Sequence, residues 1–567
     1  SDTYLPKLLG ELSSLRLQTA LCDVTLEAEG VCFPAHRIIL ASASNYCKVL
    51  FVGNVTGVGS PGGNIQLKGI SAAGLRNVLN FIYSNRLDLS LQNIEETFKA
   101  AEALLVREVI KLCFRFLEGC LDSENCMAVL NIAKKLGPAT LRQKAMGYVG
   151  QHCKQILADP RCLKDLDRET LCEILDRGIA EGCSELELFK ATVAWLQQDG
   201  TRLKDAAEIL RCIRFPLIPL RDLQRSVRGT PLMRLDSGCH RYLQEALSYH
   251  SQLYAQPVLQ TQSTSLRSTS TVLLVAGGRT TKNQVCREMW AVEQRCRAWR
   301  KVGDLCIPVY NHCVAVINDF LFVMGGQCKF DPMGKQPLNE VFRFDPRSGS
   351  WLQVASMLQR RTRFHADVLL DRIFAVGGGT LLGNLTRTVE LYRPADNKWE
   401  LAASFPTAVA DHAGTTHRGI LYISGGFSGG KTLQETYSYL PHLRRWIGNR
   451  AMAFSRCDHG MAAARDKILC IGGRTLKGVD EWVHVTEMEC YCPVSNQWTT
   501  LTLSSFSCCQ FSITAHNTTL FLAGGGSLQH MKKEDGFFLY DTEGQVWTKA
   551  SPLPKALVDH ASCMIKL

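Results

Sequence analysis

Two sets of residues in this 567-residue chain have types and spacings that could do chemistry. The first is the string GGFSGGKT, Gly425–Thr432, which matches the phosphate-binding pattern G-x-x-x-x-G-K-[ST]. Such a loop needs a strand before it and a helix after it, because backbone amides and the helix N-terminus hold the phosphates. The preceding ILYIS predicts a strand, but the residues that follow correspond to strand-like segments elsewhere in the chain. We therefore expect no nucleotide site here.

The second set is a histidine that recurs in the second half of the chain. It occurs in the pairs Asn311-His312, Phe364-His365, Asp411-His412, Asp458-His459 and Asp559-His560. Metal ligands must converge on one point, whereas one histidine in each unit of a repeating array is dispersed. We therefore interpret these histidines as structural and expect no metal site and no cofactor. No convergent ligand set or sialidase-type aspartate motif supports an enzyme.

The elements that position these residues are six copies of one short apolar string that ends in two glycines. The copies occupy residues 272–278, 320–326, 372–378, 420–426, 467–473 and 519–525. Each is followed by a tryptophan, at Trp299, Trp351, Trp399, Trp446, Trp498 and Trp547. A period of about 50 residues with paired glycines is typical of a propeller array. The apolar runs predict buried strands, and each tryptophan is expected where neighbouring blades pack.

The ends of the array predict how the ring closes. Most of the glycine strings follow a strand that begins near the recurring histidine, but residues 251–270 are polar and supply no such strand to the first copy. The missing strand comes at the C-terminus, from Asp559 to Leu567. We therefore expect the last strand to complete the first blade.

Composition narrows the class of protein. No apolar stretch is long enough to cross a bilayer, and SDTYLPKLLGELSSL lacks the layout of a signal peptide. The 24 cysteines lack metal-site spacing, which indicates reduced thiols in a cytosolic or nuclear protein. Of the net charge of +11, residues 251–567 carry +9, without runs of Lys or Arg. We therefore expect a protein partner, with no nucleic acid and no membrane.

The first half mixes strands and helices and then becomes helical. Cys22-Asp23-Val24, Ala35-His36-Arg37 and Phe81-Ile82-Tyr83 resemble the BTB domain, an α/β fold. Ser123-Glu124-Asn125-Cys126 and Arg214-Phe215-Pro216-Leu217 are similar to landmarks of the all-α BACK domain. With the six-bladed all-β propeller, the chain resembles a multidomain Kelch-like (BTB–BACK–Kelch) protein. The expected boundaries are 1–120 for BTB, 121–250 for BACK, 251–270 for a linker and 271–567 for the propeller.

The resemblance implies a non-catalytic adaptor that dimerises through its BTB domain. Many Kelch-like proteins bind cullin-3 through BTB and the first BACK helices, and hold a protein substrate at the propeller mouth. By this resemblance, the expected cullin-binding residues are Phe51, Val55, Gly57, Tyr83 and Asn125.

The sequence departs from the family at Gly57. Cullin-binding members carry a glutamate there, in an apolar-x-Glu motif, and the loss of one interfacial carboxylate costs about 1–3 kcal/mol. Two functions therefore stay open: a substrate adaptor of a cullin-3 ubiquitin ligase, and a BTB–Kelch scaffold without ligase activity.

The mouth residues follow from their place in the repeat. Similarity to Kelch adaptors puts substrate contacts immediately before the recurring histidine and immediately after the paired glycines. The expected contacts are Arg279, Asn311, Gln327, Arg363, Phe364, Asp411, Phe427, Asp458, Arg474 and Asp559. Cys509 is the approximate counterpart in the degenerate repeat, and Arg361 and Arg456 lie close in sequence. Three aspartates indicate a basic or amide-donor ligand, whereas the charge of +9 indicates an acidic one; we favour the local signal.

Overall fold

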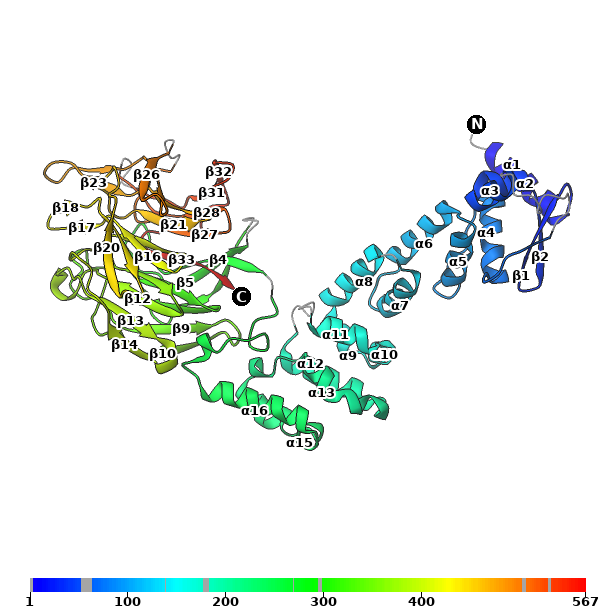
Figure 1. Cartoon of the computed structure of the whole chain (residues 1–567), viewed down its shortest axis with the longest axis horizontal. Helices are drawn as coiled ribbons and strands as arrows, with labels where there is room; N and C mark the ends of the chain where they lie inside the picture. The colour runs from blue at the N-terminus through cyan, green and yellow to red at the C-terminus, as the bar shows by residue number, and fades with distance from the viewer. Residues whose placement is uncertain are drawn as a thin grey trace. The chain divides into compact units, whose positions relative to one another are not determined.

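The computed structural model describes residues 4–52, 64–137, 139–176, 183–268, 270–293, 298–501, 506–528 and 532–567. The chain divides into two compact units, residues 1–213 and 214–567, which are described separately. The expected multidomain architecture is confirmed: an α/β region, an all-helical region and an all-β propeller follow one another along the chain (Figure 1). No helix among the described residues is long and apolar enough to span a bilayer.

The first unit begins with a small sheet surrounded by helices. Strand β1 (Val24–Ala28) pairs antiparallel with β2 (Val31–Ala35) and parallel with β3 (Asn64–Gln66). The helices are α1 (Tyr4–Leu17), α2 (Arg37–Ala43), α3 (Asn45–Val52), α4 (Ala72–Ser84), α5 (Ile94–Ala103) and α6 (Arg107–Gly119). The inward side chains of β1 and the apolar faces of α4–α6 form one core. The sheet thus gains the cover that three short strands need.

The rest of the first unit is helical, as the sequence predicts. Its helices are α7 (Cys126–Leu136), α8 (Ala139–Gln151), α9 (Cys153–Ala158), α10 (Pro160–Asp165), α11 (Arg168–Asp176), α12 (Glu185–Gln197) and α13 (Ala206–Leu210). Ser184 begins α12 with a reciprocal capping box to Glu187. Trp195 is buried and donates its indole N–H to the Leu166 carbonyl at 2.8 Å. Helix packing is therefore fixed by both apolar burial and directed hydrogen bonds.

The second unit begins with helices. They are α14 (Leu220–Asp222), α15 (Leu232–Leu235) and α16 (Ser237–Ser251), and the short 3-10 turn η4 (Gln256–Val258) follows. The division between the two compact units falls after residue 213, while the expected end of the BACK region at residue 250 stays a prediction.

The segment expected to be a linker, residues 251–270, is docked onto the second blade. Arg343 is 2% exposed and donates to the Leu253 carbonyl at 2.7 Å and to Gln256 Oε1 at 3.0 Å. Arg347 donates to the Thr264 carbonyl at 2.9 Å. The segment expected to be a polar linker thus supplies two backbone carbonyls and one side-chain amide as acceptors for these arginines.

The propeller consists of six four-stranded antiparallel sheets. Blade 1 holds β33 (Ala561–Lys566), β4 (Thr271–Ala276), β5 (Glu288–Glu293) and β6 (Trp299–Asp304); blade 2 holds β7 (Cys313–Ile317), β8 (Phe320–Met324), β9 (Val341–Asp345) and β10 (Ser350–Val354). Blade 3 holds β11 (His365–Leu369), β12 (Arg372–Val376), β13 (Val389–Arg393) and β14 (Lys398–Leu401); blade 4 holds β15 (Ala413–His417), β16 (Ile420–Ser424), β19 (Thr436–Leu440) and β20 (Arg445–Asn449). Blade 5 holds β21 (Gly460–Ala464), β22 (Lys467–Ile471), β25 (Glu489–Cys492) and β26 (Gln497–Thr500); blade 6 holds β27 (Ser512–His516), β28 (Thr519–Ala523), β31 (Phe537–Asp541) and β32 (Val546–Lys549).

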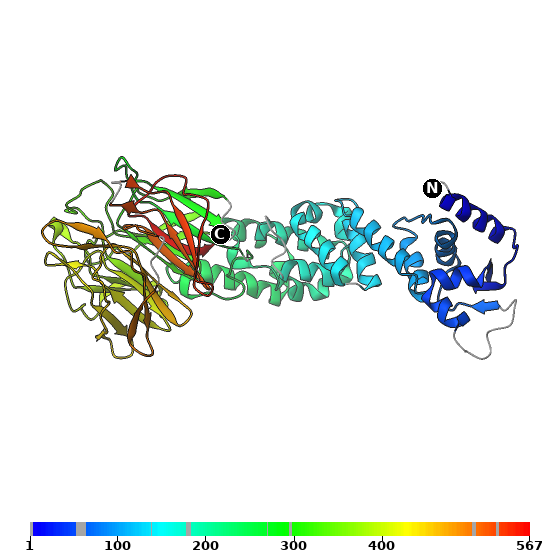
Figure 2. The ribbon, with the colours of Figure 1, turned by 90° about the horizontal axis from the view of Figure 1, so that it is seen from above.

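The C-terminal strand joins the first blade. β33 pairs antiparallel with β4 over its whole length, from Ala561 opposite Ala276 to Lys566 opposite Thr271. Figure 2 shows the red end of the chain lying against the green strands of this blade. One sheet thus combines strands from both ends of the propeller sequence, so the ring has no open blade.

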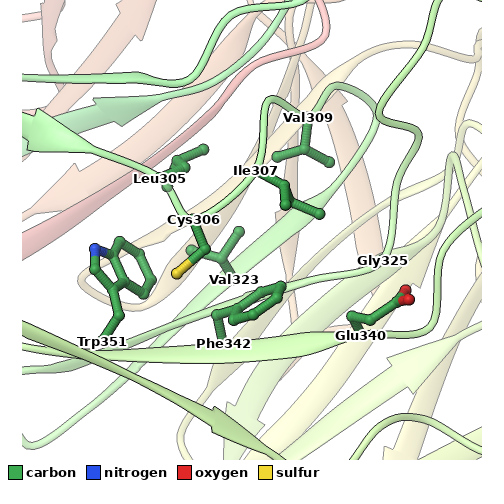
Figure 3. Close-up of a pocket in the computed structure, with 9 residues that line it drawn as sticks. All are labelled: Leu305, Cys306, Ile307, Val309, Val323, Gly325, Glu340, Phe342 and Trp351. Atoms are coloured by element: carbon green, nitrogen blue, oxygen red, sulfur yellow. The ribbon is translucent and has the colours of Figure 1, made fainter.

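The recurring tryptophans join neighbouring blades. Trp399 donates its indole N–H to the Ala355 carbonyl of the preceding blade at 2.8 Å, and Trp446 donates to Ala403 at 3.0 Å. Between blades 1 and 2, Trp351 instead lies beside a gap lined by Leu305 and Cys306 (Figure 3). The gap holds about 10 Å³, room for one water at most, and is no ligand site.

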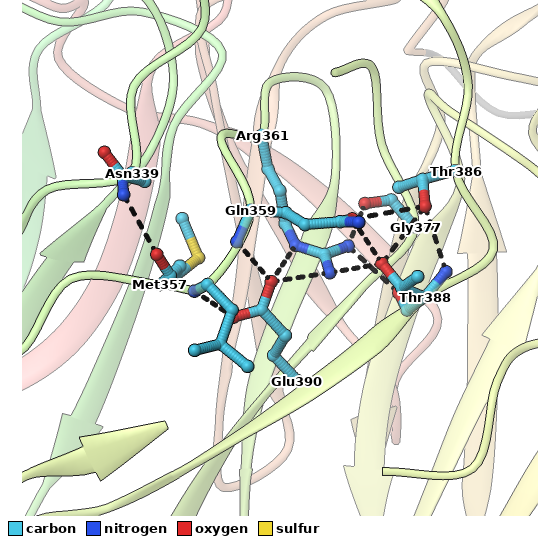
Figure 4. Close-up of polar contacts among 9 residues, drawn as sticks. Asn339, Met357, Gln359, Arg361, Gly377, Thr386, Thr388 and Glu390 are labelled. Carbon is cyan, nitrogen blue, oxygen red and sulfur yellow. Dashed lines mark hydrogen bonds and ion pairs between the residues drawn. The ribbon is translucent and has the colours of Figure 1, made fainter. Parts of the chain in front are cut away.

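Two buried arginine–glutamate pairs tie loops to sheets. Arg361 and Glu390 are both 0% exposed and lie 2.8 Å apart. Arg361 also donates to the Gly377 carbonyl, while Glu390 accepts from the backbone N–H groups of Leu358 and Gln359 (Figure 4). Arg456 and Glu489 form the equivalent pair in blade 5 at 2.7 Å. Both ion pairs thus have further hydrogen bonds to backbone groups, which stabilise charges that are buried.

Replacing Arg361 with Met is expected to destabilise the propeller, because Glu390 then remains buried without its countercharge. The expected loss in unfolding free energy is about 3–5 kcal/mol. Thermal unfolding of R361M should show a large fall in Tm, with Arg360→Met as the control, since Arg360 is exposed. Adding Glu390→Gln should restore part of the loss. Equal Tm values for R361M and R360M would contradict the prediction.

Candidate functional site

Six residues at the inner ends of the blades form a closed ring of backbone hydrogen bonds. Each donates its N–H to the carbonyl of the previous member, and N···O distances run from 2.9 to 3.2 Å. The members, in order, are Asn311, Arg363, Asp411, Asp458, Gln510 and Asp559, and the last carbonyl accepts from Asn311. All six have φ between 51° and 58°, a conformation that Asn and Asp tolerate better than most residues. We call this set the axial ring.

The axial ring corrects the repeat register at two blades. His365 lies opposite Val376, immediately before a glycine pair, as Ala413 lies opposite Ser424. His365 is therefore equivalent to Ala413, and Arg363, not Phe364, occupies the ring position of blade 3. In blade 6 the ring member is Gln510 instead of Cys509. In blade 3, Phe364 occupies the position that histidine holds in most blades, and His365 follows it. The pair Phe364-His365 therefore resembles the recurring pairs but is shifted by one residue.

A second layer lies next to the axial ring. Its members are His312, Phe364, His412, His459, Phe511 and His560, all nearly buried apart from the partly exposed Phe511. Each packs against the first glycine of the preceding blade; a Cβ on Gly425, for example, would lie 2.9 Å from His459 Cε1. Glycine at position 425, with φ of +58°, leaves room for the imidazole ring of His459.

Burial keeps the histidines of this layer uncharged. It lowers the pKa of His312 and of His412 to about 3, and that of His560 to about 4. Within the described part of the chain, no three His, Cys, Asp or Glu side chains could hold a metal ion. The histidines pack against glycine, one to a blade, which agrees with their interpretation as structural residues.

The two layers line a cavity of about 130 Å³. The second layer also lines a channel of about 540 Å³ between the inner strands of the six blades. The structure thus brings Asn311, Arg363, Asp411, Asp458 and Asp559 together at one mouth. Phe364 lines the same cavity from the second layer.

Each aspartate of the axial ring is paired with an arginine. Arg279 Nε lies 2.6 Å from Asp559, Arg363 lies 3.1 Å from Asp411, and Arg474 Nε lies 2.7 Å from Asp458. The three carboxylates are only 3–9% exposed. The arginines expected as separate substrate contacts thus neutralise the aspartates, and the free negative charge that would favour a basic ligand is largely cancelled.

Aromatic side chains cover two of these arginines. Arg279 lies between Tyr310 and Phe330, with its guanidinium carbon 5.6 and 5.2 Å from the ring centroids. Arg474 lies 4.3 Å from Trp482, which contacts Phe427. The sequence reasoning missed Phe330 and Trp482, although aromatic residues in the loops after the glycine pairs could have indicated them.

Other expected mouth residues lie deeper. Gln327 is 2% exposed and hydrogen-bonds Asp331 and Thr362. Arg361 and Arg456 are fully buried in their glutamate pairs and do not reach the mouth. These residues support the loops around the mouth.

The phosphate-loop string forms a hairpin. β17 (Phe427–Ser428) pairs antiparallel with β18 (Lys431–Thr432), directly after β16. No helix begins at Lys431, so the string lacks the helix N-terminus that a phosphate loop requires.

The expected cullin contacts of the first unit are in different environments. Tyr83 is 0% exposed, and its hydroxyl lies 2.9 Å from His36 Nδ1, so it supports the fold and offers no surface to a partner. Phe51 is half-buried with Arg37 over its ring, and Asn125 donates to the Asp122 carboxylate. Val55 and Gly57 lie outside the described residues.

Family models match all three parts of the chain. A BTB/POZ domain model matches residues 12–121, a "BTB And C-terminal Kelch" model 126–228, and an Attractin/LZTR1 beta-propeller model 273–529. Kelch-like protein 36 of Bos taurus is 30% identical over 99% of this chain and 91% of its own length. This chain belongs to the Kelch-like family.

Other Kelch-like relatives agree along the chain. Kelch-like protein 26 of Danio rerio is 30% identical over 99% of this chain and 93% of its own length. Kelch-like protein 34 of Homo sapiens is 32% identical over 91% of this chain and 88% of its own length. Kelch-like proteins are typically non-catalytic, and their BTB–BACK–Kelch order is the adaptor architecture typical of cullin-3 substrate adaptors.

Asp411 is expected to make the stability of this Kelch-like propeller depend on pH. Burial and the neighbouring Asp458 carboxylate raise the Asp411 pKa to about 7, against the effects of Arg363 and Arg474. Because this pKa exceeds the unfolded value of about 3.9, the contribution of Asp411 to stability is lost as the pH rises from about 4 through 7. The uncharged Asp411→Asn variant should therefore gain Tm relative to wild type between about pH 5 and 8.

Thermal unfolding at both pH values measures this difference, with Asp480→Asn as the exposed control. A Tm difference between D411N and wild type that stays constant with pH would show that Asp411 does not titrate in this range.

Proposed function

We propose that this protein is the substrate-recognition adaptor of a cullin-3 RING E3 ubiquitin ligase. In this proposal the BTB domain and the first BACK helices bind cullin-3, and the propeller mouth binds a protein substrate. The observation that carries the proposal is the BTB–BACK–Kelch architecture ending in a preformed mouth around the axial ring. Such a protein catalyses no covalent step itself. It holds the substrate close to the proteins that transfer ubiquitin.

Exposed apolar side chains on α2 and α3 support the cullin part of the proposal. Ile38 is 80% exposed, Val49 68% and Val52 73%. These positions directly precede the segment with Val55 and Gly57, where the family resemblance puts the cullin contact. Apolar side chains in this number on neighbouring helices are typical of a protein interface.

The surface of α1 supports a homodimer through the BTB domain. None of the side chains described on this helix is fully buried within one chain, although its sequence is rich in leucine. Tyr4 is 69% exposed, Leu8 41% and Leu17 77%. A second copy would cover these side chains, and a dimer would present two mouths and so increase avidity.

The substrate part of the proposal uses the mouth. Around the cavity, Asn311, Arg363, Asp411, Asp458 and Asp559 would contact the substrate through their unburied atoms, with Arg279, Phe427 and Arg474 around them. A protein segment suits this site, because the cavity is lined by polar side chains from all six blades.

Cysteine chemistry supports a cytosolic or nuclear location. No described cysteine forms a disulfide. Reduced thiols in such number are typical of proteins kept in a reducing compartment.

A second function, a BTB–Kelch scaffold without ligase activity, is favoured by Gly57. Glycine stands where cullin-binding relatives carry glutamate, so one charge-assisted contact is missing. The two functions differ in whether cullin-3 binds.

The deciding experiment is a pull-down of cullin-3 with the full-length protein. The adaptor predicts that wild type captures cullin-3, that Val49→Asp reduces capture at least tenfold, and that Gly57→Glu increases it. Leu235→Asp is the matched control, because Leu235 is 85% exposed outside the BTB region. If wild type captures no cullin-3 while G57E does, the scaffold is the correct function.

A further inference from the structure

Beyond the paired aspartates of the axial ring, two loops of the propeller expose apolar side chains. The loop after β8 exposes Phe330 by 42% and Met333 by 63%. The loop after β12 exposes Leu381 by 53% and Leu382 by 76%. We call these four side chains the blade 2–3 patch.

The two loops of the patch contact each other. Leu382 donates its N–H to the Lys335 carbonyl at 3.1 Å. A Cβ on Gly383 would lie 3.0 Å from the Met333 carbonyl oxygen, so glycine allows the loops to approach. The four side chains therefore belong to one continuous surface that extends across two blades.

The patch is held in place by hydrogen bonds. Asp331 accepts from the backbone N–H groups of Met333 at 3.0 Å and Lys335 at 2.8 Å. Its own N–H donates to the Tyr310 hydroxyl at 3.0 Å, beside the axial ring. Because the loop is fixed before binding, a partner meets ordered apolar side chains and loses less entropy on association.

The backbone of the patch is left-handed at Leu382. Its φ is 63°, in the left-handed region that leucine rarely adopts. Asparagine tolerates this conformation better than leucine, so it is the suitable replacement for testing the side chain.

Basic groups border the patch. Lys329 and Lys335 flank Phe330 and Met333 in the sequence and are exposed. Exposed Arg360 donates to the Pro337 carbonyl of the same loop at 3.4 Å. The carboxylate of the loop, Asp331, already accepts two backbone hydrogen bonds. A partner with carboxylates beside its apolar side chains complements this border.

We propose that the blade 2–3 patch docks a substrate segment in which apolar side chains are flanked by Asp or Glu. The apolar side chains cover Phe330, Met333, Leu381 and Leu382, while the flanking carboxylates face Lys329, Lys335 and Arg360. This inference rests on the proposed function, because it names the class of substrate for the propeller mouth. It replaces the basic ligand that three aspartates predict, because each of these aspartates is paired with an arginine.

The test is selection of a random dodecapeptide phage library on the full-length protein, followed by affinity measurement with the best synthetic peptide. Enriched peptides should combine Leu, Ile, Phe or Met with Asp or Glu. The double variant Met333→Ser/Leu382→Asn should weaken this peptide at least tenfold; asparagine suits the left-handed backbone and preserves the loop. Lys335→Glu should also weaken it, and more strongly at low salt.

Matched controls lie on the loop of blade 5. Val479 is 94% exposed and Lys477 is exposed, so Val479→Ser and Lys477→Glu change similar groups away from the patch. The inference is overturned if the enriched peptides are basic, if no peptide is enriched, or if the patch and control variants bind alike. Peptide binding does not involve cullin-3, so a failed cullin pull-down with a positive selection would reject the ligase function alone.

Discussion

The propeller depends on six backbone hydrogen bonds that close into a ring around its axis. Asn311 and Asp559 are neighbours in this ring, although 248 positions separate them in the sequence. Their contact exists because β33 completes the first blade, which also brings Asp559 to Arg279. A local interaction at the mouth is therefore held by pairing of the two ends of the propeller sequence. The His and Phe side chains of the second layer pack beside the axial ring in the space that the glycine pairs leave free.

Five arginines of the propeller are paired with carboxylates inside the fold. Arg361 and Arg456 form ion pairs with buried glutamates. Arg279, Arg363 and Arg474 form ion pairs with the aspartates of the axial ring. The exposed side chains around the mouth therefore come mainly from the outer loops, and these differ from blade to blade. On blades 2 and 3 these loops offer apolar side chains beside lysines. The same propeller framework can therefore present different binding surfaces in different proteins, depending on the side chains of the outer loops.

The sequence predicts most of the fold and several of the residues that line the mouth cavity. The glycine pairs and tryptophans recur at a regular period, so the blades and the strand that closes them can be located without a structure. The residue of blade 3 that belongs to the axial ring could not be located in this way. The histidine of Phe364-His365 lies one position after the place where the other blades carry it. Pairing of Asp411 with Arg363 joins two blades, and a sequence does not show which side chains meet across blades. Tyr83 shows the same limit of a sequence. The family resemblance makes it an expected cullin contact, but the sequence does not show that its side chain is buried.

Arg343 and Arg347 have a practical consequence for how the protein is divided. Both take their acceptors from residues 253–264, before the first strand of the propeller. A recombinant fragment cut at residue 271 would leave two guanidinium groups on blade 2 without these carbonyl and amide acceptors. The smallest independent piece should start near Arg214, so that the helices before the first blade are expressed with it.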